Sequence, residues 1–194
     1  ALPARTGRGI SLHDSFGSYV ALVIEAHVTT SGEVQLKRAV AAVDCGLNVN
    51  PNSVAAQIEG GAIFGLSAAL FNGITLADGR VEQSNFNDYR QIRINEVPPF
   101  EVHIVKSGED PGGVGECGTV SAAPALGNAI FAATGRRLRK LPFDRASLAD
   151  NGSDKTVSAA IPLGVGLSLG LATLGSRPVD DATAPVAACP SAVG

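Results

Sequence analysis

The chain has 194 residues, of which 45% are hydrophobic and 17% charged, so it can bury a core and is not an intrinsically disordered protein. Its net charge of −3 and pI near 5.6 exclude the broad positive surface of a nucleic-acid-binding protein. The three cysteines, Cys45, Cys117 and Cys189, form no C-x-x-C pair, so we expect no zinc or iron–sulfur site on this chain.

The first half of the chain predicts a hairpin followed by a long helix. Residues 19–28 and 33–43 are apolar runs on either side of Gly32, which is typical of two antiparallel strands, and His13 precedes the first. Asn50 and Pro51 suit a helix start, and apolar residues recur every fourth position, so we expect a helix over about 51–70. Three glycines inside it, Gly60, Gly61 and Gly65, indicate either a close crossing with another element or close approach to a ligand.

The second half predicts shorter elements. Residues 74–83 read as a hairpin with Asp78 and Gly79 at its tip, and residues 84–100 as irregular. A strand is expected over 101–107 and a long loop over 107–120. A second helix is expected over 121–135, ending at Gly135, before a basic stretch over 136–143. The fold class is therefore α+β, with mixed sheets and hairpins flanked by helices.

The composition changes after Phe143. Residues 144–194 are rich in Ala, Gly, Ser, Pro and Asp, so we expect a domain over 1–143 and a loose tail over 144–194. Within that tail, residues 157–174 carry no charge. Their proline and three glycines make them a poor membrane helix.

The loop PGGVGECGT (111–119) allows two functional interpretations. Gly113, Gly115 and Gly118 have the G-x-G-x-x-G spacing of a dinucleotide-binding turn, and the basic residues at 136–140 would suit a 2′-phosphate of NADP. Glu116 would then face the pyrophosphate, and no β-α-β alternation surrounds the loop. The loop could instead present Glu116 as a general base. A plain solvent-exposed glutamate is the third interpretation, and spacing alone leaves all three open.

Several segments resemble one family in one order along the chain. GGVGECGTVSAAPALGNAIFAATGRRLRKLPF (112–143), QIEGGAIFGLSAAL (57–70) and AVDCGLNVNP (42–51) resemble the molybdenum hydroxylases, the xanthine oxidase family. Within it they most resemble the molybdopterin-binding subunits of isoquinoline 1-oxidoreductase, nicotinate dehydrogenase and related aldehyde dehydrogenases. Relatives usually carry proline where this chain has Cys117.

The resemblance implies a site and a cofactor. The chain would be the C-terminal portion of a molybdopterin-binding domain, holding molybdenum as molybdopterin cytosine dinucleotide without side-chain ligands to the metal. Glu116 would be the general base, Gln57 would contact the cofactor through its amide, and Gly113, Val114 and Gly115 would offer backbone N–H groups. The reaction would oxidise an N-heterocycle or an aldehyde, with water as the oxygen source.

The resemblance also implies partners. Electrons would leave through a separate small subunit with [2Fe–2S] clusters, and in some relatives through a cytochrome c. The location would be periplasmic or cytoplasmic, with the periplasm favoured, and no nucleic-acid partner is expected. The rival interpretation is a truncated, non-catalytic fragment of a molybdopterin-binding polypeptide.

Overall fold

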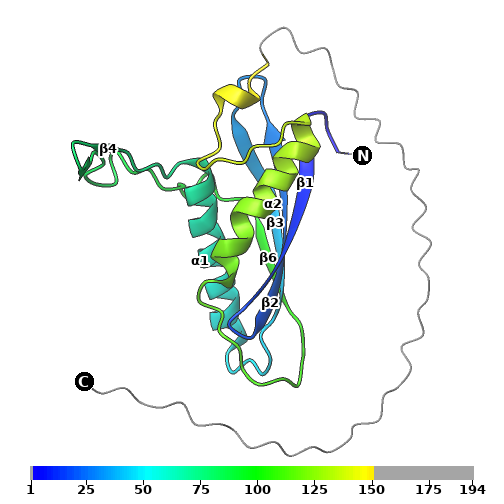
Figure 1. Cartoon of the computed structure of the whole chain (residues 1–194). Helices are drawn as coiled ribbons and strands as arrows, with labels where there is room; N and C mark the ends of the chain where they lie inside the picture. Colours follow the sequence, from blue (N-terminus) through cyan, green and yellow to red (C-terminus); the bar gives the residue numbers. More distant parts are fainter. Residues whose placement is uncertain (1, 151–194) are drawn as a thin grey trace, which may run out of the picture. The chain divides into compact units, whose positions relative to one another are not determined.

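The computed structural model describes residues 2–150, which form a four-stranded sheet with two helices on one face (Figure 1). The strands are β1 (Thr6–Ser15), β2 (Ser18–Val28), β3 (Val34–Asp44) and β6 (Phe100–Ile104), in the order β1-β2-β3-β6. The first three strands pair antiparallel, and β6 pairs parallel to β3. The helices are α1 (Pro51–Leu70) and α2 (Cys117–Thr134). This arrangement confirms the predicted α+β class.

The predicted hairpin is confirmed as β2 and β3, but the strand before it was missed. His13 lies inside β1 rather than ahead of the first strand. β1 lacks an apolar run because Gly7, Gly9 and polar residues alternate along it. It is extended because it pairs along its whole length with β2, through a two-residue turn at Phe16 and Gly17 with positive φ at both.

Helix α1 begins and ends where the sequence predicts. The Asn50 side chain accepts hydrogen bonds from the backbone N of Asn52 at 3.0 Å and of Ser53 at 3.2 Å, and Pro51 occupies the first turn. The residues at the predicted fourfold spacing form the buried stripe: Val54, Ile58, Ala62 and Leu66. Among residues 2–150, α1 is the helix long and apolar enough to cross a membrane, and its buried stripe also fits a core helix.

Helix α2 ends at left-handed Gly135, as predicted, but begins at Cys117, four residues earlier than expected. Gly118 and Thr119 are weak helix formers, so the first turn is set by packing rather than propensity. Packing on β1 is direct: a Cβ at Gly7 or Gly9 would come within 2.3 or 2.2 Å of a backbone oxygen of α2. Only residues without side chains allow this approach.

The two helices cross closely at their glycines. A Cβ at Gly65 would lie 2.4 Å from Thr119 O, and one at Gly118 would lie 2.4 Å from Ile58 O. Thr119 Oγ1 donates to Gly61 O at 3.0 Å in the same region. The close-crossing interpretation therefore holds for Gly61 and Gly65, whereas a Cβ at Gly60 would meet nothing within 4 Å.

The connection between the helices contains the remaining elements. The predicted hairpin is confirmed as β4 (Leu76–Ala77) and β5 (Arg80–Val81), with positive φ at Asp78 and Gly79. Residues 84–99 contain no helix or strand, as expected. The strand expected over 101–107 is the shorter β6, which begins one residue earlier.

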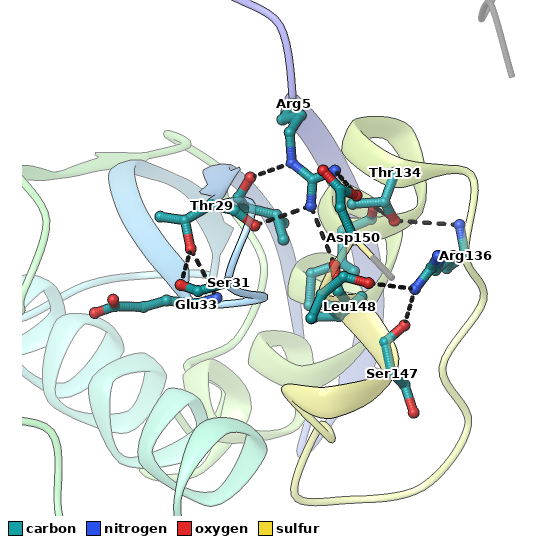
Figure 2. Close-up of polar contacts among 12 residues, drawn as sticks. Arg5, Thr29, Ser31, Glu33, Thr134, Arg136, Ser147, Leu148 and Asp150 are labelled. Carbon is teal, nitrogen blue, oxygen red and sulfur yellow. Dashed lines mark hydrogen bonds and ion pairs between the residues drawn. The ribbon is translucent and has the colours of Figure 1, made fainter. Parts of the chain in front are cut away.

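Residues 144–150 are packed, so the domain extends past the boundary expected at Phe143. The short 3₁₀ helix Ala146–Leu148 buries Leu148 to 1% exposure. Figure 2 shows Arg5 donating to the carbonyls of Thr29 and Leu148 at 2.9 and 3.1 Å and pairing with Asp150. Composition gave no sign of these long-range contacts. Residues 151–194, including the uncharged stretch 157–174, lie outside the described part.

Candidate functional site

The glycine loop is fixed to two neighbouring segments. Gly113 N donates to Phe16 O at 2.8 Å, in the β1–β2 turn, and Gly112 N donates to Cys45 O at 2.9 Å, just after β3. Leu47 N donates to Glu109 O at 2.9 Å. These bonds hold residues 109–113 against one end of the sheet, where the loop cannot move as a free tether.

Cys117 fixes the other side of the loop. Its thiol is fully buried, donates to Gly113 O at 3.2 Å and lies 3.5 Å from Ser15 Oγ. Gly113 and Cys117 therefore close a short turn that contains Glu116. Sequence reasoning identified Glu116 but missed these positioning contacts. The only signal for them was the polar turn sequence around Ser15, which no local rule connects to a loop about a hundred residues away.

Glu116 is the N-cap residue of α2, and its side chain is exposed. Its backbone oxygen accepts from Thr119 N at 2.9 Å and Val120 N at 3.3 Å, but its carboxylate makes no capping hydrogen bond. Within residues 2–150, no ion pair or hydrogen bond engages this carboxylate. A fixed backbone thus presents a free carboxylate to the outside.

Gln57 lies on α1 beside the helix crossing. Its side chain is exposed, and the next residue, Ile58, contacts Gly118 two positions after Glu116. The crossing therefore brings the turn of α1 that carries Gln57 to the turn of α2 that follows Glu116. The structure groups these two predicted residues at one end of the helix pair.

The three predicted backbone donors differ in availability. The N–H of Gly113 is engaged by Phe16 O, so this residue holds the loop in place. Among residues 2–150, no acceptor engages the N–H groups of Val114 and Gly115. A Cβ at Gly115 would meet nothing within 4 Å, so this part of the loop faces open space. Two free donors, an amide and a free carboxylate fit a polar, anionic cofactor.

Other features of residues 2–150 lie away from this group. No cluster of three or more His, Cys, Asp or Glu could hold a metal ion there. A cavity of about 410 Å³ lies at the other end of β3, where Leu36, Phe71, Arg90 and Phe143 are among its lining residues. Neither feature adds chemistry to the Glu116 loop.

The structure contradicts the NADP interpretation of the glycine spacing. Gly113 packs on Phe16, and Gly118 lies inside α2, where its missing side chain admits Ile58 O of α1. The basic residues at 136–140 follow the far end of α2, about 27 Å from its start for an 18-residue helix. They cannot reach a phosphate at the loop. Two of these glycines thus serve packing.

Residues 6–98 match the profile of the molybdopterin cofactor-binding domain. The curated relatives extend the similarity through the glycine loop and α2. The chain is 39% identical over 145 residues to the beta subunit of isoquinoline 1-oxidoreductase from Brevundimonas diminuta, covering 72% of this chain and 19% of that protein. This chain belongs to the molybdopterin-binding family of the molybdenum hydroxylases.

Other relatives agree. This family member is 40% identical to a membrane-bound aldehyde dehydrogenase of Gluconacetobacter polyoxogenes, covering 65% of this chain and 16% of that protein. It is 33% identical to a nicotinate dehydrogenase polypeptide of Pseudomonas putida, covering 75% and 14%. The chain therefore spans less than a fifth of the length of these relatives.

Solved structures show the same fold. The aldehyde oxidoreductase from Desulfovibrio desulfuricans superposes with a TM-score of 0.60 at 24% identity, covering 69% of this chain and 16% of that one. A Cu,Mo-CO dehydrogenase superposes with a TM-score of 0.56 at 24% identity, covering 61% and 16%. The predicted fold and family are confirmed, while the individual site residues remain predictions.

Proposed function

We propose that this chain supplies one wall of the catalytic site of a molybdenum-dependent hydroxylase or dehydrogenase, with Glu116 as its general base. The observation that carries the proposal is the free Glu116 carboxylate on a loop pinned at Gly113 and Cys117. A general base must keep its lone pairs available and its position fixed. The described contacts of Glu116 meet both requirements.

The cofactor in this proposal is molybdopterin cytosine dinucleotide, which supplies the two-electron redox chemistry when it is bound. The N–H groups of Val114 and Gly115 would donate to its anionic or oxo groups, and the amide of Gln57 can both donate and accept. Gly113 has the positioning role that its bond to Phe16 gives it. No side chain of residues 2–150 is assigned to the metal.

In the proposed reaction, a Glu116 carboxylate oxygen accepts the proton of the hydroxyl that attacks the substrate. Removing that proton makes the oxygen a stronger nucleophile toward an electron-poor carbon. The names of the relatives support an N-heterocycle or an aldehyde as the substrate. Electrons would then leave through a small [2Fe–2S] subunit, and in one arrangement onward to a cytochrome c.

The test is Glu116→Gln in the assembled enzyme, because glutamine keeps the size of glutamate and loses the base. We expect kcat to fall by about 10²–10⁴ with molybdenum content unchanged. Glu109→Gln is the matched control, since Glu109 is an exposed glutamate of the same loop that bonds through its backbone oxygen. Turnover of the Glu116→Gln enzyme within about tenfold of the parent would refute the assignment.

A further inference from the structure

The face of the sheet opposite the helices is defined by the strand register. Directly opposed residues share a face, so Ile10, Val23 and Val40 form one cross-strand row. Leu12, Ala21 and Ala42 form the next row. We call these six residues the outer face. The alternate residues of β2 and β3, such as Leu22 and Ala41, are fully buried under the helices.

The outer face is apolar and uncovered. Ile10 is 60% exposed and Leu12 is 73% exposed, and in Figure 1 both helices lie on the other side of the sheet. Within residues 2–150, no helix or strand covers this face. A sheet with one solvated face alternates apolar and polar residues, whereas strands buried on both faces read as continuous apolar runs. β2 reads SYVALVIEAHV, which is the second pattern.

The edge of β1 is not the exposed feature that matters. Asn128 Nδ2, on α2, donates to Ile10 O at 2.9 Å and so occupies a backbone acceptor of this edge strand. Ser11 Oγ donates to Ser121 O at 2.7 Å, which ties the strand to the same helix. Strand addition at this edge would compete with these contacts, so the surface available for docking is the face.

Charges border the two apolar rows differently at each end. On one side, Arg8 pairs with Glu25 at 2.8 Å, and Arg38 pairs with Glu101 at 2.7 Å, so these charges satisfy one another. On the other side, the row Asp14–Tyr19–Asp44 is acidic. Among the described residues, no cation pairs with Asp14 or Asp44. A complementary partner is therefore apolar at its centre and basic at this end.

The position of the acidic row connects the face to the candidate site. Asp14 and Tyr19 flank the β1–β2 turn, and that turn holds the glycine loop through Phe16 O. Whatever covers the outer face thus reaches the loop that carries Glu116. In the relatives, more than four fifths of the polypeptide lies outside the matched part.

We propose that the outer face is the docking surface for another folded layer of a molybdenum-binding subunit, contributed by the region that precedes or follows the matched part in the relatives. That layer buries Ile10, Leu12 and Val23 and places lysine or arginine against Asp14 and Asp44. The inference concerns assembly and does not depend on the catalytic role of Glu116.

The test supplies that region as a separate polypeptide. The probe is the beta subunit of isoquinoline 1-oxidoreductase from Brevundimonas diminuta with the matched part deleted, co-expressed with the tagged 194-residue chain. We expect the two to co-purify in a one-to-one complex. Leu12→Glu should weaken the complex about 30-fold or more, as the loss of a central apolar contact does at an interface.

Ile94→Glu is the matched control, because Ile94 is 93% exposed and lies in the segment between β5 and β6. It should leave the complex unchanged, and circular dichroism should show that both variants keep the fold. Three results would overturn the proposal: no complex with the unmodified chain, a complex insensitive to Leu12→Glu, or a homodimer of the chain that Leu12→Glu dissociates. The last result would assign the face to a second copy.

Discussion

Two glycines five positions apart on α1 should respond in opposite ways to the same substitution. Gly60→Ala adds a methyl group into open space, and Gly65→Ala adds one at the crossing with α2. Alanine is better than glycine in a helix interior by about 0.8–1.0 kcal/mol. Gly60→Ala should therefore stabilise the chain by up to about 1 kcal/mol.

At Gly65 the same gain is opposed by overlap. The new Cβ would lie 2.4 Å from Thr119 O and 2.8 Å from Ala122 Cβ, where favourable carbon contacts need about 3.5–4.0 Å. The helices must separate by about 1 Å, and overpacking of this kind costs about 1–3 kcal/mol. Because Thr119 belongs to a backbone that packing fixes on both sides, we expect the upper part of that range. The net loss is then about 1–2 kcal/mol.

The assay is equilibrium urea unfolding of the full chain, followed by far-ultraviolet circular dichroism. The two variants should differ by at least about 2 kcal/mol at an unchanged m-value. If Gly65→Ala is as stable as Gly60→Ala, the helices are not in the close contact described and the packing explanation of the glycines fails.

Three further substitutions test other contacts. Ser18→Ala should be neutral or stabilising by up to about 1 kcal/mol, because Ser18 Oγ is buried without a partner within residues 2–150, whereas Ser121→Ala should cost about 1 kcal/mol because it removes a 3.1 Å bond to Cys117 O. Urea unfolding decides both, and a larger loss at Ser18 contradicts the reasoning. Arg5→Lys should cost about 1–2 kcal/mol because lysine cannot reproduce the fork to Val28 O and Thr29 O, while exposed Arg8→Lys should stay within about 0.5 kcal/mol; equal losses would refute it. Burial, then neighbouring Asp44, raises the pKa of the Cys45 thiol, so its stabilising contribution is complete below the ordinary thiol pKa and is lost as the pH rises through the raised value. Stability should fall in that alkaline range, Cys45→Ala should flatten the fall, and an unchanged slope in that variant would contradict the assignment.

Local patterns predicted the elements whose signals are local. The fourfold spacing from Val54 to Leu66 and the Asn50 cap specified α1 to the residue, and left-handed Gly135 ended α2 as expected. The strand β1 was missed because its inward residues are Gly7 and Gly9, which read as a loop until a helix packs on them. The seven residues after Phe143 were missed for the same reason, since their order depends on Arg5.

The candidate site divides along the same line. Glu116 and Gln57 were found through motif resemblance, and the helix crossing that groups them follows from glycines visible in the sequence. The roles of Phe16, Cys45 and Cys117 in holding the loop depend on contacts between distant segments. No spacing rule predicts such contacts, so the free state of Val114 and the engaged state of Gly113 required the structure.

The Arg5 contacts also bear on how this unit can be built into other proteins. Arg5 and Asp150 lie at opposite ends of the described sequence, yet their side chains meet at 2.6 Å. A domain whose entry and exit points coincide can be inserted into a surface loop of a host without stretching either chain. The same adjacency permits circular permutation: a short linker joining the two ends, with new termini opened at the exposed Asp78–Gly79 tip, should preserve the sheet and both helices.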